Sequence, residues 1–133
     1  MSDKHFIDTN VLIYTVGDII IKKYQAIQLL KTNAIISTQV INESINVMYR
    51  KLKYDYASIR DILTEILRRV ELCLITEQTI LVALTLAEKY RYSYFDSLMI
   101  ASALEQGCPI LYSEDLQHGQ KIKNQLNIIN PFL

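Results

Sequence analysis

The chain has 133 residues, half of them apolar, with only 3 Gly and 2 Pro, which excludes a disordered or fibrous protein. Such a length is most simply one domain, spanning residues 1–133. Fourteen basic residues balance fourteen acidic ones, whereas nucleic-acid binders usually carry excess positive charge, so any contact with nucleic acid must come from local patches. No uninterrupted apolar run is long enough to cross a bilayer, so no membrane association is expected.

Short apolar segments are predicted to form buried strands. In chain order they are "KHFID" (4–8), "AIIS" (34–37), "LCLI" (72–75), "PILYS" (109–113) and, as a candidate fifth, "NIIN" (127–130). Between them, helices are predicted to begin near Val11 and to cover the helically spaced apolar residues of 41–52, 59–70, 79–90 and 96–107. Strands that alternate with helices predict an α/β protein, a three-layer α/β/α sandwich with a short, mostly parallel central sheet.

The amino end, "MSDKHFIDTN", has no basic segment followed by an apolar stretch, so no secretory signal is expected. Cys73 and Cys108 both lie in apolar surroundings. Buried free thiols in a cytoplasmic protein are expected, with a disulfide as the alternative. Zinc is not expected, because His5 and His118 are isolated and no Cys pair has ligand spacing.

Four acids fall where a parallel sheet places its ligands, beyond the carboxyl ends of the strands. Asp8 ends the first predicted strand, and Glu43 lies in the first turns of the helix after the second strand. Asp96 opens the helix before the fourth strand, and Asp115 follows that strand by two residues. We therefore expect these acids to meet at one edge of the sheet.

Each acid also has a structural explanation. Asp8 is suited to cap the following helix, and Asp115 could belong to a tight turn. Asp96 and Ser93 have the spacing of a capping box. Glu43 lies opposite the apolar stripe of its helix, as a solvated side chain would, and taken alone it is better explained that way. For the other three acids both explanations stay open.

Taken together, the acids favour a metal site. Asp8 lies between a buried strand and an apolar helix, where a solvated acid is not the default, and Asn10 and Ser113 add neutral oxygens at the same strand ends. Two carboxylates about 5 Å apart repel by roughly 3 kcal/mol at an effective dielectric constant of ~20, and a divalent cation removes that repulsion. Carboxylate, amide and hydroxyl oxygens without Cys or His are the ligands of Mg²⁺ or Mn²⁺.

Basic and aromatic residues alternate in two segments. "YRKLKYDY" (49–56) places Arg50, Lys51 and Lys53 among three tyrosines, and "YRYSY" (90–94) has a similar mixture. Aromatic rings beside cations suit RNA, through stacking on bases and contacts with phosphates. The alternative is an amphipathic helix end whose lysines extend to solvent.

At these residues the sequence resembles the PIN-domain family, in particular the VapC-type toxins of toxin–antitoxin pairs. The matching segments, in family order and spacing, are "FIDTNVLIY", "STQVINESINVM", "YFDSLMIASA", "ILYSEDLQHGQ" and "INPF". The resemblance covers nearly the whole chain and implies a PIN-like fold.

The resemblance also implies roles for individual residues. Asp8, Glu43, Asp96 and Asp115 match the four acids that surround the metal in the family, and would be both metal ligands and catalytic residues. Asn10 and Ser113 match the polar positions that support those acids. Asp115 is preferred over the neighbouring Glu114 because "SED" (113–115) fits the family's Ser/Thr-x-Asp pattern.

The implied activity is Mg²⁺- or Mn²⁺-dependent endoribonuclease cleavage of RNA, with one or two ions. The implied partner is a cognate antitoxin whose tail covers the site, and family members pair as homodimers. The apolar helices between residues 39 and 71 are long for a small core and could supply the groove for a partner. The alternative function is a non-catalytic PIN-like module that binds RNA or a protein.

Overall fold

The computed structural model describes residues 3–133, so Met1 and Ser2 of the expected domain lie outside it. Its centre is a sheet with the strand order β3-β2-β1-β4-β6-β5. The strands are β1 His5–Ile7, β2 Ala34–Ser37, β3 Glu71–Cys73, β4 Ile110–Tyr112, β5 Lys121–Ile122 and β6 Leu126–Ile129. Neighbouring strands are parallel except β5, which runs antiparallel to β6. The mostly parallel sheet predicted from the sequence is confirmed.

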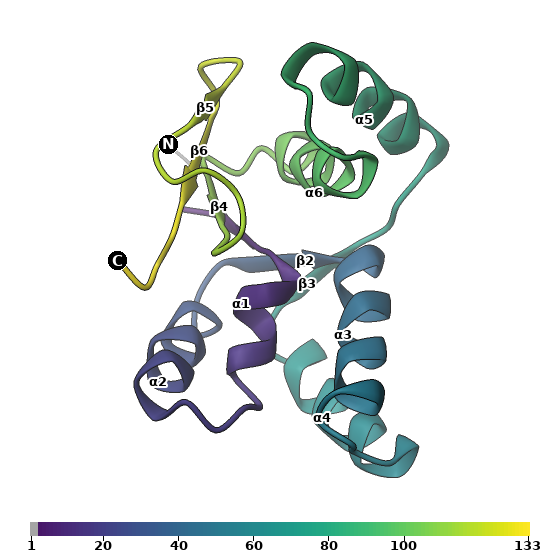
Figure 1. Ribbon diagram of the computed structural model, residues 1–133, viewed down its shortest axis with the longest axis vertical. Coiled ribbons are helices and arrows are strands. Elements are labelled where there is room, and N and C mark those ends of the chain that lie inside the picture. Colours follow the sequence, from purple (N-terminus) through teal and green to yellow (C-terminus); the bar gives the residue numbers. More distant parts are fainter. Residues whose placement is uncertain (1–2) are drawn as a thin grey trace.

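Helices cover the sheet on both sides (Figure 1), which confirms the three-layer α/β/α sandwich. Helices α5 and α6 lie on one side, and α1 to α4 lie on the other. Their bounds are α1 Thr9–Tyr14, α2 Ile20–Leu29, α3 Thr38–Arg50, α4 Tyr56–Leu67, α5 Glu77–Tyr90 and α6 Tyr94–Glu105. No helix among residues 3–133 is long and apolar enough to span a membrane.

The core lies on both sides of the sheet, and α6 is its most enclosed helix. All four residues of β2 are buried, as the continuous apolar segment predicted, and Phe6 and Ile7 of β1 are fully buried beside them. Helix α6 is buried over seven consecutive residues, 97–103, so it presents apolar or small side chains on every side. A helix enclosed in this way is held firmly, which fixes the position of its first turn and of Asp96 there.

Two elements were not predicted from the sequence. Helix α2 buries only Ala26 and exposes Ile20, Ile21 and Tyr24, so it has no apolar stripe that faces the core. Strand β5 has two residues, and the turn to β6 contains Lys123 and Asn124 at positive φ without the glycine that usually marks a hairpin.

Both cysteines are buried free thiols, so the disulfide alternative is wrong. Burial raises the pKa of Cys73 and that of Cys108 to about 11. Because the thiolate is the reactive form, both side chains are inert packing residues at neutral pH.

Candidate active site

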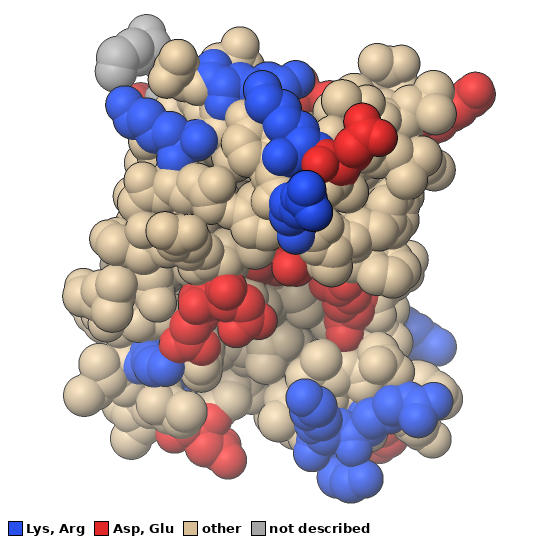
Figure 2. Space-filling model, turned by 45° about the horizontal axis from the view of Figure 1, so that its top comes forward, with Lys and Arg blue, Asp and Glu red and all other residues tan. Residues whose placement is uncertain are grey.

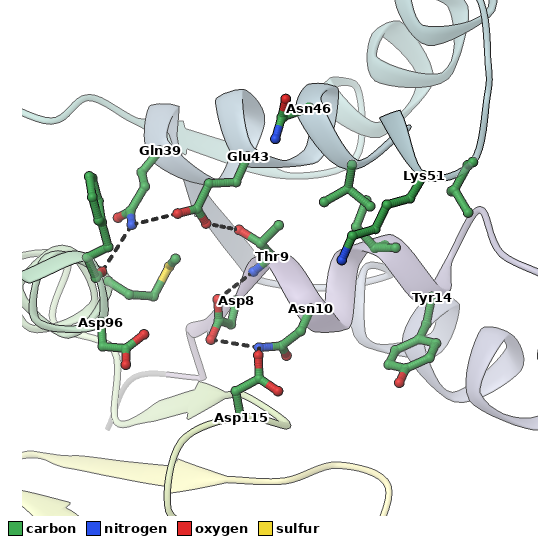
Figure 3. Close-up of a pocket in the computed structure, with 15 residues that line it drawn as sticks. Asp8, Thr9, Asn10, Tyr14, Gln39, Glu43, Asn46, Lys51, Asp96 and Asp115 are labelled. Atoms are coloured by element: carbon green, nitrogen blue, oxygen red, sulfur yellow. Dashed lines mark hydrogen bonds between the residues drawn. The ribbon is translucent and has the colours of Figure 1, made fainter. Parts of the chain in front are cut away.

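All four predicted acids line one cavity of about 610 Å³ (Figure 3). Asp8 follows β1, Glu43 lies on α3 after β2, Asp96 lies in the first turn of α6, and Asp115 follows β4. On the face shown in Figure 2, acidic side chains border a hollow, and basic side chains lie both beside them and further out. The parallel sheet therefore brings together residues that are up to 107 positions apart in the chain, as expected from the strand ends.

Asp8 both caps a helix and faces the cavity. Its Oδ1 accepts a hydrogen bond from the backbone N–H of Thr9 at 2.6 Å, at the start of α1. Its Oδ2 accepts from Ser113 Oγ at 2.8 Å and from Asn10 Nδ2 at 3.1 Å. Burial raises the pKa of the Asp8 carboxyl to about 6, with a smaller contribution from the charge of Glu43, against those hydrogen bonds. A cation in the cavity would stabilise this buried charge.

Glu43 does not occupy the solvated position that its place on the helix suggests. Its side chain is half-buried, with Oε1 accepting from Thr9 Oγ1 at 2.6 Å and Oε2 accepting from Gln39 Nε2 at 3.2 Å. Both oxygens are thus held at the wall of the cavity (Figure 3).

Asp96 takes part in only half of the predicted capping box. Its backbone N–H donates to Ser93 Oγ at 3.1 Å, which caps α6. Its carboxylate makes no hydrogen bond within residues 3–133 and points toward Asp8 in Figure 3. The cap and the carboxylate are therefore separable, because the cap uses the backbone of Asp96 and leaves its side chain to the cavity.

The structure distinguishes Asp115 from Glu114. Asp115 lines the cavity, and its Oδ2 accepts from Asn10 Nδ2 at 3.1 Å. Glu114 instead turns its two oxygens to Lys22 Nζ and the Tyr14 hydroxyl, and these contacts are consistent with the lowered pKa of its carboxyl despite partial burial. The geometry favours Asp115 as the fourth acid of the cavity.

Asn10 and Ser113 lie beside the acids at the strand ends, where they were expected from the sequence. The Asn10 amide donates to Asp8 and to Asp115, while its Oδ1 accepts from the backbone N–H of Glu114 at 2.9 Å. Fully buried Ser113 donates to Asp8 and accepts from the backbone N–H of Leu116 at 3.2 Å. These two side chains tie the β1 and β4 ends of the cavity together.

The donor set fits a hard divalent cation, although within residues 3–133 no three acids converge closely enough to hold one ion as they stand. The carboxylates turn instead to Asn10, Thr9 and Gln39, the arrangement expected when their mutual repulsion is not offset by an ion. The acids share the cavity with hydroxyl and amide groups and with Lys51, and neither His nor Cys lines it.

Of the predicted RNA contacts, only Lys51 lines the cavity, and Arg50 and Lys53 do not. The tyrosines of this segment are partly engaged elsewhere: the rings of Tyr49 and Tyr56 stack on each other with centroids 4.4 Å apart. The Tyr54 hydroxyl donates to the carbonyl of Val16 at 2.8 Å, so Tyr54 is a structural residue.

Two residues of the site, Thr9 and Gln39, were not singled out from the sequence. Both contact Glu43, and Gln39 precedes it by four positions, so the two lie on the same face of α3. That spacing was the available signal for Gln39. Thr9 stands between Asp8 and Asn10, and nothing in its type or spacing distinguished it.

Comparisons with known proteins agree with the fold described above. The profile of the PIN domain matches residues 5–122. A toxin–antitoxin complex from Klebsiella pneumoniae has a similar structure, with a TM-score of 0.71 and 18% identity over 96% of this chain and 98% of that one. Mycobacterium tuberculosis VapC20, described as a sarcin–ricin loop cleaving toxin, has a TM-score of 0.68 and 18% identity, over 84% of this chain and 90% of that one. DNA-bound VapBC from Salmonella typhimurium has a TM-score of 0.64 and 18% identity, over 94% of this chain and 96% of that one. No curated protein matches the sequence.

Proposed function

The chain belongs to the PIN-domain family, and from that premise we propose that it is a divalent-metal-dependent endoribonuclease, the toxin of a toxin–antitoxin pair. In this proposal one nuclease domain spans residues 1–133 and acts in the cytoplasm. The observation that carries the proposal is the cavity in which Asp8, Glu43, Asp96 and Asp115 are brought together from four separate segments. Similar structures include VapC20, a toxin that cleaves the sarcin–ricin loop, and toxin–antitoxin complexes.

Asp8, Glu43, Asp96 and Asp115 would hold Mg²⁺ or Mn²⁺. When bound, such an ion lowers the pKa of its water and neutralises charge on a phosphoryl oxygen. Asn10 and Ser113 orient Asp8, and Lys51 stands at the cavity wall with a positive charge suited to a flanking phosphate. The cavity has no Cys or His, and its Thr9 hydroxyl is bonded to Glu43, so a water molecule is the expected nucleophile.

Purified protein incubated with mixed RNA and Mg²⁺ or Mn²⁺ should cleave it, and EDTA should abolish cleavage. The alternative function, a non-catalytic module that binds RNA or a protein, predicts binding without new RNA ends. Cleavage that survives complete chelation would contradict the metal mechanism. Inducible expression followed by sequencing of new RNA ends would identify the target.

Lys51 should contribute more to RNA binding than its basic neighbours. Lys51→Gln should weaken binding of single-stranded RNA and reduce the magnitude of its salt slope by about 1, because fewer counterions are released. Arg50→Gln and Lys53→Gln are matched controls that remove a charge from the same segment outside the cavity. Fluorescence anisotropy at several salt concentrations, in an Asp96→Asn background to prevent turnover, measures the effect. Equal slopes for all three variants would place no special contact at Lys51.

A homodimer and a cognate antitoxin are the proposed partners. Ile20, Ile21 and Tyr24 on α2 are each more than half exposed, and so are Leu81 and Leu84 on α5, on the other side of the sheet (Figure 1). Each helix therefore presents apolar side chains that a partner could cover. We expect a dimer by sedimentation at micromolar concentration and a small adjacent open reading frame for the antitoxin. A monomer throughout that range would contradict the dimer, and an isolated gene would favour a stand-alone nuclease.

A further inference from the structure

Gln39 links two elements that carry acids of the cavity. It lies in the first turn of α3 and is 7% exposed. Its Nε2 donates to Glu43 Oε2 at 3.2 Å and to the backbone carbonyl of Phe95 at 3.0 Å (Figure 3). Phe95 directly precedes Asp96 in the first turn of α6. One amide group therefore spans from Glu43 to the backbone beside Asp96.

The orientation of this amide is determined by its partners. Exchanging its oxygen and nitrogen would place Oε1 against a carboxylate oxygen and a carbonyl oxygen, two acceptors that need a donor. In the observed orientation Oε1 is buried and has no hydrogen-bond partner within the described residues. A buried unsatisfied oxygen lowers stability, so an apolar side chain would serve packing alone at least as well.

Glu43 needs such a contact because it reaches the cavity on a long side chain from a helix surface. Thr9 holds one of its oxygens and Gln39 the other. Partners of this kind fix the direction of a ligand before the ion arrives, and their loss typically lowers metal affinity. Resting on the function proposed above, we infer that Gln39 is a positioning residue that sets Glu43 and the start of α6, with Asp96, at the spacing that a divalent cation requires.

Gln39→Leu, which keeps the size of the side chain and removes its donors, tests the inference. Calorimetric titration of the metal-free variant with Mn²⁺ should give an affinity about 10–100-fold below wild type. Its metal-free melting temperature combines two opposing changes, the removal of the buried unsatisfied oxygen and the loss of the donor to Glu43 and Phe95, so Mn²⁺ affinity is the deciding measurement. Asn42→Leu is the matched control: Asn42 lies on the same helix, is exposed and does not line the cavity, so this change should leave Mn²⁺ affinity unchanged.

Wild-type affinity in Gln39→Leu would overturn the inference and leave the proposed function standing. Wild-type Mn²⁺ affinity together with a lower melting temperature would assign Gln39 to packing and overturn the inference equally. If wild type itself bound no Mn²⁺, the proposed metal site would be overturned. This failure is distinguishable from failure of the Gln39 inference, because it is seen in the unsubstituted protein. If Gln39→Leu does not fold, Gln39→Met carries the same expectations, because methionine is also apolar and, like glutamine, unbranched.

Discussion

Asp96→Asn should abolish RNA cleavage and leave the metal-free protein about as stable as wild type, or more stable. The loss of cleavage should exceed the about 10–100-fold effect typical of outer-shell partners, because Asp96 is a proposed ligand. The cap of α6 uses the backbone N–H of Asp96 and Ser93 Oγ, so it survives the substitution. What the helix loses is the interaction of a charge with its dipole, about 0.3–1 kcal/mol, and we expect relief of repulsion among the acids that line the cavity to offset it.

Thermal melts with EDTA and with Mg²⁺ measure this expectation. Wild type should gain stability from Mg²⁺, since an ion that binds only the folded state shifts the equilibrium toward it, and Asp96→Asn should gain less. Ser93→Ala is the complementary control, because it removes the cap and keeps the carboxylate. It should lose about 1 kcal/mol in both buffers and still cleave. If Asp96→Asn were destabilised equally in both buffers and remained active, Asp96 would be only a capping residue.

The fold was predictable where burial decides it. β2 and β4 are continuous apolar segments, and the stripe of α3 has helical spacing, so sequence and structure agree there. Helix α2 could not be predicted in this way, since its exposed isoleucines have no periodic relation to the core. Strand β5 is formed by two residues whose pairing depends on β6, a tertiary contact that local sequence does not encode.

The site was predictable as far as topology decides it. Parallel strands bring their carboxyl ends to one edge, so Asp8 and Asp115 could be placed together from the strand assignments alone. The contacts of Glu43 could not be predicted, because they depend on side-chain rotamers and on how closely α3 approaches α6. The family pattern already favoured Asp115 over Glu114, and the structure adds the contacts that distinguish them, because Glu114 binds Lys22 and Asp115 accepts from Asn10.

In metal-free wild type, the contribution of Asp8 to the free energy of unfolding should fall by about 3 kcal/mol between about pH 3 and about pH 7. Burial raises its pKa from 3.8 to about 6, so the folded state holds this proton more tightly than the unfolded state does. The stabilisation is complete below the unfolded value and is lost as pH rises through the folded value. Asp55 and Glu114, whose pKa values are lowered, change stability in the opposite direction.

Urea unfolding in EDTA across this pH range, for wild type and for Asp8→Asn, isolates the contribution of Asp8. The amide of the variant would face the Nδ2 of Asn10, a donor against a donor, and lower stability by an amount that does not depend on pH. The comparison therefore rests on how the difference between the two proteins changes with pH, not on its absolute size. Saturating Mg²⁺ should remove the decline, because the ion favours ionised Asp8 in the folded state. Parallel pH profiles for the two proteins in EDTA would mean that Asp8 is ionised in the folded protein at its ordinary pKa, so that burial imposes no penalty on its charge for a cation to relieve.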